Sequence, residues 1–191
     1  MYRQKFLSLL GLLSLSILNR KAMADSNSEP QKFYFKDDGK IPNSKLPLLV
    51  YRAGLSGNIS ASRLQEHFAS NNWTNSWDNG VYSFHHYHST SHEVLGVYSG
   101  SALLQLGGEH GEKVKVQAGD IIIIPAGVGH KNLEASSDFG VVGAYPDGRT
   151  WDFLKGAPGE RPAADKNIAA LPIPTADPLH GKGGGLSRIW S

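Results

Sequence analysis

Short runs of β-branched and aliphatic residues, separated by glycine-rich turns, dominate the centre of the chain. Val114 and Val116 alternate with polar residues over 113–117, which predicts a strand with one face in solvent. Ile121–Ile124 is continuously apolar, which predicts a strand buried on both faces. Further strands are expected over Phe33–Phe35, Leu48–Arg52, Ala102–Leu106 and Phe139–Tyr145. Many short strands with such turns are typical of a β-sandwich or barrel.

The flanks of this strand-rich region follow other patterns. Ser62-x-x-Gln65 resembles a capping box ahead of two apolar positions, which predicts one short helix over about 62–71. The stretch 71–80 is expected to be a loop. Residues 146–191 hold six of the ten prolines and seven glycines, so we expect an irregular tail that packs on the barrel. The predicted organisation is therefore a β-barrel domain over 25–145 followed by this tail.

The N-terminal segment has the features of an export signal. Residues 1–24 contain four basic residues and no acid, and Phe6–Leu18 is an apolar run of thirteen residues. This run is short for a membrane span. Ala22-Met23-Ala24 has the small-x-small pattern of a cleavage site, so cleavage after Ala24 and a periplasmic or secreted location are expected. The alternatives are an uncleaved N-terminal anchor, an organelle transit peptide, or a cytoplasmic protein.

Composition narrows the classes of function. The chain has 191 residues and a formal net charge of +2. Without residues 1–24, 167 residues remain, with 15 basic and 17 acidic side chains. The chain lacks the excess of basic residues that would indicate nucleic-acid binding. No stable membrane association is expected after cleavage of residues 1–24. The absence of cysteine excludes disulfides, thiolate metal sites and a catalytic cysteine.

Histidines cluster in one short segment. Four of the eight lie between His85 and His92. On a strand, His86 and His88 point to the same face, and His85 to the other. After a turn, Glu93 could stand beside the two histidines. Two imidazoles and a carboxylate on one face can bind a divalent metal ion.

A second segment offers a further ligand. Ile121–Ile124 runs into Pro125-Ala126-Gly127, and His130 follows after two residues. Proline and glycine fix a turn there, and the next strand brings His130 back along the sheet. A buried histidine needs a polar partner or a metal ion.

These two segments closely resemble the motifs of the cupin superfamily. The first motif is G-x5-H-x-H-x(3,4)-E-x6-G, and all five of its specified positions are matched, by Gly80, His86, His88, Glu93 and Gly100. The second, G-x5-P-x-G-x2-H-x3-N, is matched from Gly119 to His130. Its final asparagine is replaced by Glu134, and that asparagine is not a usual metal ligand. The run from His85 to Gly96 is similar to the YjlB-like single-domain cupins.

The resemblance implies a small all-β jelly-roll barrel with a metal ion in its mouth. The ligands that it implies are His86, His88, Glu93 and His130, with one or two coordination positions open. The alternative to Glu93 as a ligand is His92, which follows His88 after three residues, whereas Glu93 follows it after four. Iron, manganese, nickel, copper and zinc all fit this ligand set.

The function that the resemblance implies is that of a metal-dependent enzyme on a small organic substrate. Oxygenase or oxidase chemistry comes first, and isomerisation and decarboxylation follow. The alternative is a non-enzymatic cupin that binds a metal ion or a small molecule. A secreted germin-like protein is a third reading, against which the absence of cysteine argues. The superfamily also allows a homodimer.

Overall fold

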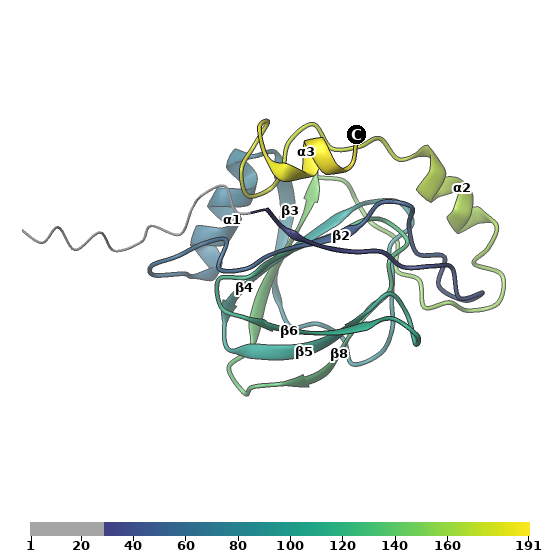
Figure 1. Ribbon diagram of the computed structural model, residues 1–191, viewed down its shortest axis with the longest axis horizontal. Coiled ribbons are helices and arrows are strands. Elements are labelled where there is room, and N and C mark those ends of the chain that lie inside the picture. The colour runs from purple at the N-terminus through teal and green to yellow at the C-terminus, as the bar shows by residue number, and fades with distance from the viewer. Residues whose placement is uncertain (1–28) are drawn as a thin grey trace, which may run out of the picture.

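Two antiparallel sheets face each other in the computed structural model, which describes residues 29–191 (Figure 1). The larger sheet has the order β1-β2-β7-β4-β9-β3 and the smaller one β6-β5-β8. The strands of the larger sheet are β1 (Gln31–Phe33), β2 (Leu48–Tyr51), β3 (Trp73–Asn79), β4 (Glu93–Ser99), β7 (Ile121–Ile124) and β9 (Gly140–Pro146). Those of the smaller sheet are β5 (Ser101–Leu106), β6 (Glu112–Gln117) and β8 (His130–Ala135). The predicted all-β jelly-roll fold is confirmed.

The main core lies between the two sheets. Ile122 and Ile124 of β7 pack there against residues of the smaller sheet such as Leu104 and Val116. Val114 and Val116 point inward from β6, while Lys113 and Lys115 are exposed. The alternation predicted for this strand therefore places one face in the core and the other in solvent.

A second core covers the outer face of the larger sheet. Ile121 and Ile123 point to this side, which explains why β7 is apolar at every position. Helix α1 (Ala61–Ser70) packs Leu64 and Phe68 onto this face. The C-terminal segment covers another part of it through α3 (Gly185–Ile189) and Trp190. Figure 1 shows α3 on the side of the larger sheet opposite β5, β6 and β8.

Several local predictions need correction. The stretch expected to be a loop over 71–80 contains β3, which pairs with β9. Helix α1 begins at Ala61, and its N-cap is Ser60, whose side chain accepts a hydrogen bond from the Arg63 amide. The C-terminal segment contains two short helices, α2 (Ala163–Ala170) and α3, where only irregular chain was expected.

The expected export signal over 1–24 lies outside the described residues. Within residues 29–191, no helix has the length and hydropathy that a membrane span requires.

Candidate metal centre

Three histidines from two distant segments meet at one end of the barrel. His86 and His130 form an isolated antiparallel bridge in which each backbone amide donates to the other's carbonyl, at 3.2 and 3.0 Å. The segment around His86 is therefore not a regular strand, although its alternation holds. His86 and His88 are buried facing the site, whereas Tyr87 is buried on the opposite side against Ile41.

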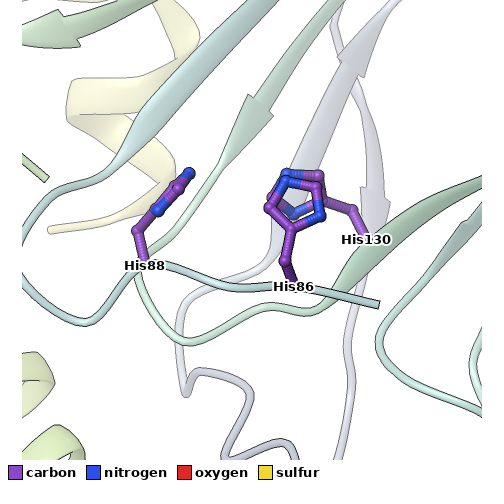
Figure 2. A group of neighbouring side chains, drawn as sticks. All are labelled: His86, His88 and His130. Atoms are coloured by element: carbon purple, nitrogen blue, oxygen red, sulfur yellow. The ribbon is translucent and has the colours of Figure 1, made fainter. Parts of the chain in front are cut away.

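The three imidazoles are close enough to share one metal ion. One nitrogen from each of His86, His88 and His130 lies within 4.8 Å of the others. Figure 2 shows the three rings gathered at one side of their backbone segments. All three side chains are at least 95% buried, so they lie in an environment that disfavours extra charge.

Glu93 joins this group from the first position of β4. Its Oε2 lies 3.3 Å from His130 Nε2 and 3.7 Å from His88 Nε2. Strand β4 does not pair with the histidine segment, because its partners are β7 and β9. The carboxylate still reaches the histidines because Glu93 pairs with Ile124, at the end of β7 that leads towards His130.

Backbone carbonyls fix the tautomer of each histidine. Nδ1 of His86 faces the Phe84 carbonyl at 3.4 Å, and Nδ1 of His130 faces the Val128 carbonyl at 3.2 Å. Nδ1 of His88 faces the carbonyl of Asp152. A carbonyl only accepts, so each Nδ1 carries a proton, and a ring without a second proton has its lone pair on Nε2. This arrangement is usual for histidines that bind metal ions through Nε2.

Burial and the charges of neighbouring side chains shift the pKa values of the site residues in opposite directions. Burial, with the neighbouring His130, lowers the pKa of His86 to about 2. Burial also acts to lower the pKa of His88, but the Glu93 carboxylate outweighs it and raises that pKa. For Glu93, burial alone would raise the pKa, yet His88 and His130 hold it below its usual range. The carboxylate is therefore ionised, as a metal ligand must be.

A hydrogen-bonded chain holds Glu93 in position. The Trp77 indole donates to the Tyr145 hydroxyl at 2.8 Å, and that hydroxyl donates to Glu93 Oε1 at 2.9 Å. Oε2 has no hydrogen-bond partner among the described residues, although it is buried. When the histidine protons are on Nδ1, Oε2 faces lone pairs of Nε2. A cation between them satisfies both, so the residues present fit a metal ion.

His92 does not take part in this group. Its Nδ1 accepts a hydrogen bond from the Ala126 amide at 3.0 Å, and its ring packs against Trp190, 5.0 Å between centroids. It therefore belongs to the packing under the C-terminal segment. His85 also points elsewhere and pairs with Glu109 at 3.2 Å.

A cavity of about 330 Å³ opens onto the three histidines and Glu93. Its walls include five aromatic side chains, Trp77, Tyr82, Tyr145, Trp151 and Phe153. Sequence reasoning did not single these out, because three of them lie in or beyond β9, outside both metal motifs. The one available signal was their density: Tyr145, Trp151 and Phe153 fall within nine residues of a polar stretch.

Known proteins resemble this chain at two levels. A sequence profile of the cupin domain matches residues 78–139. The uncharacterised protein YjlB of Bacillus subtilis (strain 168) is 44% identical over 163 residues, which are 85% of this chain and 97% of that protein.

Solved structures match more distantly. Acireductone dioxygenase of Bacillus anthracis, with cadmium in its active centre, is 19% identical over 47% of this chain and 60% of its own, with a TM-score of 0.33. Procruciferin, an 11S globulin of Brassica napus, is 20% identical over 43% of this chain and 22% of its own, with a TM-score of 0.35. The chain thus spans less than two thirds of either protein. The near full-length match to YjlB carries the assignment, and the chain belongs to the YjlB-like single-domain members of the cupin superfamily.

Proposed function

We propose that the protein holds one divalent transition metal ion on His86, His88, His130 and Glu93 and is a metal-dependent enzyme acting on a small organic molecule. One observation carries this proposal. Three buried histidines each offer a nitrogen within 4.8 Å of the others, and beside two of them, His88 and His130, lies a buried carboxylate oxygen that has no hydrogen-bond partner among the described residues. Such a set is unfavourable without a cation and favourable with one.

The surrounding residues support a reaction rather than a closed structural site. The cavity of about 330 Å³ gives a small molecule access to the histidines, and its size lies within the range of ligand sites. Tyr145 holds Glu93 from the side, which leaves Oε2 directed at His88 and His130. A bound metal ion would supply Lewis-acid chemistry and, for a redox metal, electron transfer, which fits an oxygenase, oxidase or isomerase.

Metal analysis of the purified protein is the decisive experiment. We expect near-stoichiometric metal by mass spectrometry and its loss from the double variant His86→Ala/His88→Ala. His110→Ala, which changes an exposed histidine in the turn between β5 and β6, is the matched control and should retain the metal. A protein that binds no metal after anaerobic reconstitution would contradict the proposal. The histidines would then line a pocket that binds a ligand directly.

Turnover separates the enzyme from the alternative, a non-enzymatic binding protein. Iron, copper or nickel in the purified protein would favour oxygenation, manganese an oxidase or isomerase, and zinc a non-redox reaction. Oxygen uptake or product formation with candidate substrates then tests the enzyme. A small molecule that binds the loaded site without turnover supports the binding protein instead.

We further propose that residues 1–24 direct export to the periplasm or the medium. The basic residues, the apolar run and the Ala22-Met23-Ala24 pattern support this. Intact-mass analysis of the exported protein should give a chain that begins at Asp25. A full-length chain retained in the cytoplasm would contradict it.

A further inference from the structure

Aromatic side chains collect at the mouth of the metal cavity and are partly in solvent. Tyr82, Phe84 and Phe153 are 55%, 39% and 40% exposed, and they are three of the five large hydrophobic residues so exposed within 29–191. Their rings contact one another: Tyr82 stacks on Phe84 at 5.1 Å and meets Phe153 edge-on at 5.2 Å. An exposed group of this kind marks a surface that binds something apolar.

The aromatic surface continues from the mouth to the metal ligands. Phe153 stacks on the His86 ring, 5.0 Å between centroids and 24° between planes. Deeper in the cavity, Tyr145 and Trp151 stack at 4.0 Å and 13°. A ligand that reaches the histidines therefore passes flat rings along the cavity wall. Flat rings favour a flat partner, because offset stacking and edge contacts add to the buried area.

One cation stands at the same mouth. Lys155 Nζ lies 4.5 Å from the Phe84 ring centre and 5.5 Å from that of Phe153. It forms no ion pair within the described part of the chain. The nearby Glu160 carboxylate is held by the Tyr87 hydroxyl and by the backbone amides of Lys155 and Gly156. Lys155 is thus available to an anionic group on a ligand.

We propose that this cavity selects a small planar aromatic acid: a single ring held between the aromatic walls, with its anionic group towards Lys155. A cavity of about 330 Å³ suits one substituted ring. The inference rests on the proposed function only for the end of the ligand that faces the metal. Asp78 also lines the cavity and accepts a hydrogen bond from Tyr98, so the charge preference is assigned to the side of Lys155.

The test compares two probes that differ in the ring alone. Salicylate and cis-2-hydroxycyclohexanecarboxylate carry the same oxygen groups, but only salicylate is flat. Isothermal titration calorimetry should show salicylate binding about tenfold more tightly, the gain expected from contact with the stacked walls. We expect this preference in chelator-treated protein, where the rings alone decide it and no metal ion favours the phenol oxygen of salicylate. Loss of metal binding would therefore contradict the proposed function without removing the ring preference.

Two variants locate the preference. Phe153→Leu keeps an apolar side chain but removes the ring, and it should weaken salicylate about fivefold with little effect on the saturated probe. Lys155→Gln should weaken both acids about threefold. Tyr34→Leu and Lys32→Gln change exposed residues that do not line the cavity and should leave both affinities unchanged. Equal binding of the two probes, no binding of salicylate, or an unaffected Phe153→Leu would overturn the inference.

Discussion

Tyr145 is the residue through which the protein positions Glu93, the carboxylate of the proposed metal centre. Its hydroxyl donates to Glu93 Oε1 and receives the Trp77 indole proton. The phenol is buried, and burial together with the Glu93 charge raises its pKa far above the usual range. The hydroxyl therefore stays protonated at neutral pH and acts as a hydrogen-bond donor.

Removing this hydroxyl should weaken metal binding without unfolding the protein. Tyr145→Phe keeps the ring and its stacking on Trp151 but leaves Glu93 Oε1 without a donor. We expect the metal affinity to fall about tenfold, the usual cost of losing a group that orients a ligand. Chelator competition measures this affinity. Tyr98→Phe removes a hydroxyl that bonds exposed Asp78 and should leave the affinity unchanged. A Tyr145→Phe protein with unaltered affinity would show that Glu93 needs no such support.

Buried neutral histidines make the metal-free protein sensitive to acid. Burial lowers the pKa of His92 to about 4 and, with His130, that of His86 to about 2, from 6.5 in the unfolded chain. Below pH 6.5 these two histidines bind protons in the unfolded chain but stay neutral in the folded protein. The free energy of unfolding therefore falls as the pH falls. The raised pKa of His88 acts in the opposite direction: it adds stability below pH 6.5, which is lost as the pH rises through the folded value.

The lowered pKa values of His86 and His92 together outweigh the raised pKa of His88. Acid should therefore destabilise the metal-free fold. Urea unfolding of chelator-treated protein between pH 7.5 and 5 should show a free energy of unfolding that falls by about 1.4 kcal/mol per pH unit for each net proton. His92→Gln should flatten this slope, with His110→Gln as the control at an exposed site. A slope that rises towards acid would mean that the His88–Glu93 attraction dominates.

Motif spacing predicted which residues would meet, but not what surrounds them. Ligand spacing within a chain segment is local information, and the two segments carry it for His86, His88, Glu93 and His130. The structure brings these four together, and their role as ligands stays a prediction. Tyr145, Trp151 and Phe153 reach the same cavity from a stretch over fifty residues after Glu93. Only the tertiary fold sets that proximity.

At the scale of elements, an isolated antiparallel bridge between Leu154 and Tyr87 ties the segment after β9 to the histidine segment. Leu154 and Tyr87 exchange both backbone hydrogen bonds, at 2.9 and 3.0 Å. Asp152 accepts from the amides of Ser89 and Thr90, and its backbone carbonyl faces His88 Nδ1. The segment therefore fixes both the turn after His88 and the orientation of that ring.

Asp152 should be required for both stability and metal affinity. Asp152→Ala removes the acceptor of the two amides, and we expect a loss of about 2–3 kcal/mol in the free energy of unfolding and a metal affinity about tenfold lower. Asp152→Asn keeps one oxygen acceptor and should lose much less. Denaturant unfolding and chelator competition on the same samples measure the two effects. Equal behaviour of both variants would mean that the carboxylate oxygens do not order the turn.

Edge position explains the strand that sequence reasoning missed. In β3, only Trp73 and Trp77 are large and apolar, and the strand lies at the edge of the larger sheet. A register shift separates Thr74 from Trp77, where Asn75 has a positive φ of 55°. An irregular edge strand with one half-exposed face shows no clean alternation, so a loop was the natural expectation. Strand β7, at the centre of the sheet, was predicted with its bounds correct.

For the whole molecule, the C-terminal segment completes the second core. Trp190 is only 1% exposed, donates its indole proton to the Pro47 carbonyl at 2.9 Å and packs on His92. Asp177 is fully buried and accepts from the Tyr51 hydroxyl and from the Leu179 and Leu186 amides. The part of the chain from Asp177 to Trp190 is thus held at both of its ends.

Because this core lies on the face of the sheet opposite the barrel interior, its loss should lower stability more than it alters the metal site. Trp190→Ala empties a large buried volume and should cost about 3–5 kcal/mol in the free energy of unfolding. Trp190→Phe retains most of the packing and should cost clearly less. Denaturant unfolding measures the loss. Metal content at low temperature should stay near that of the native protein, since the Trp190 ring packs on the ring of His92 and not on that of His86, His88 or His130. If Trp190→Ala loses its metal while still folded, the two cores are coupled through His92 and Glu93, which are adjacent in the chain.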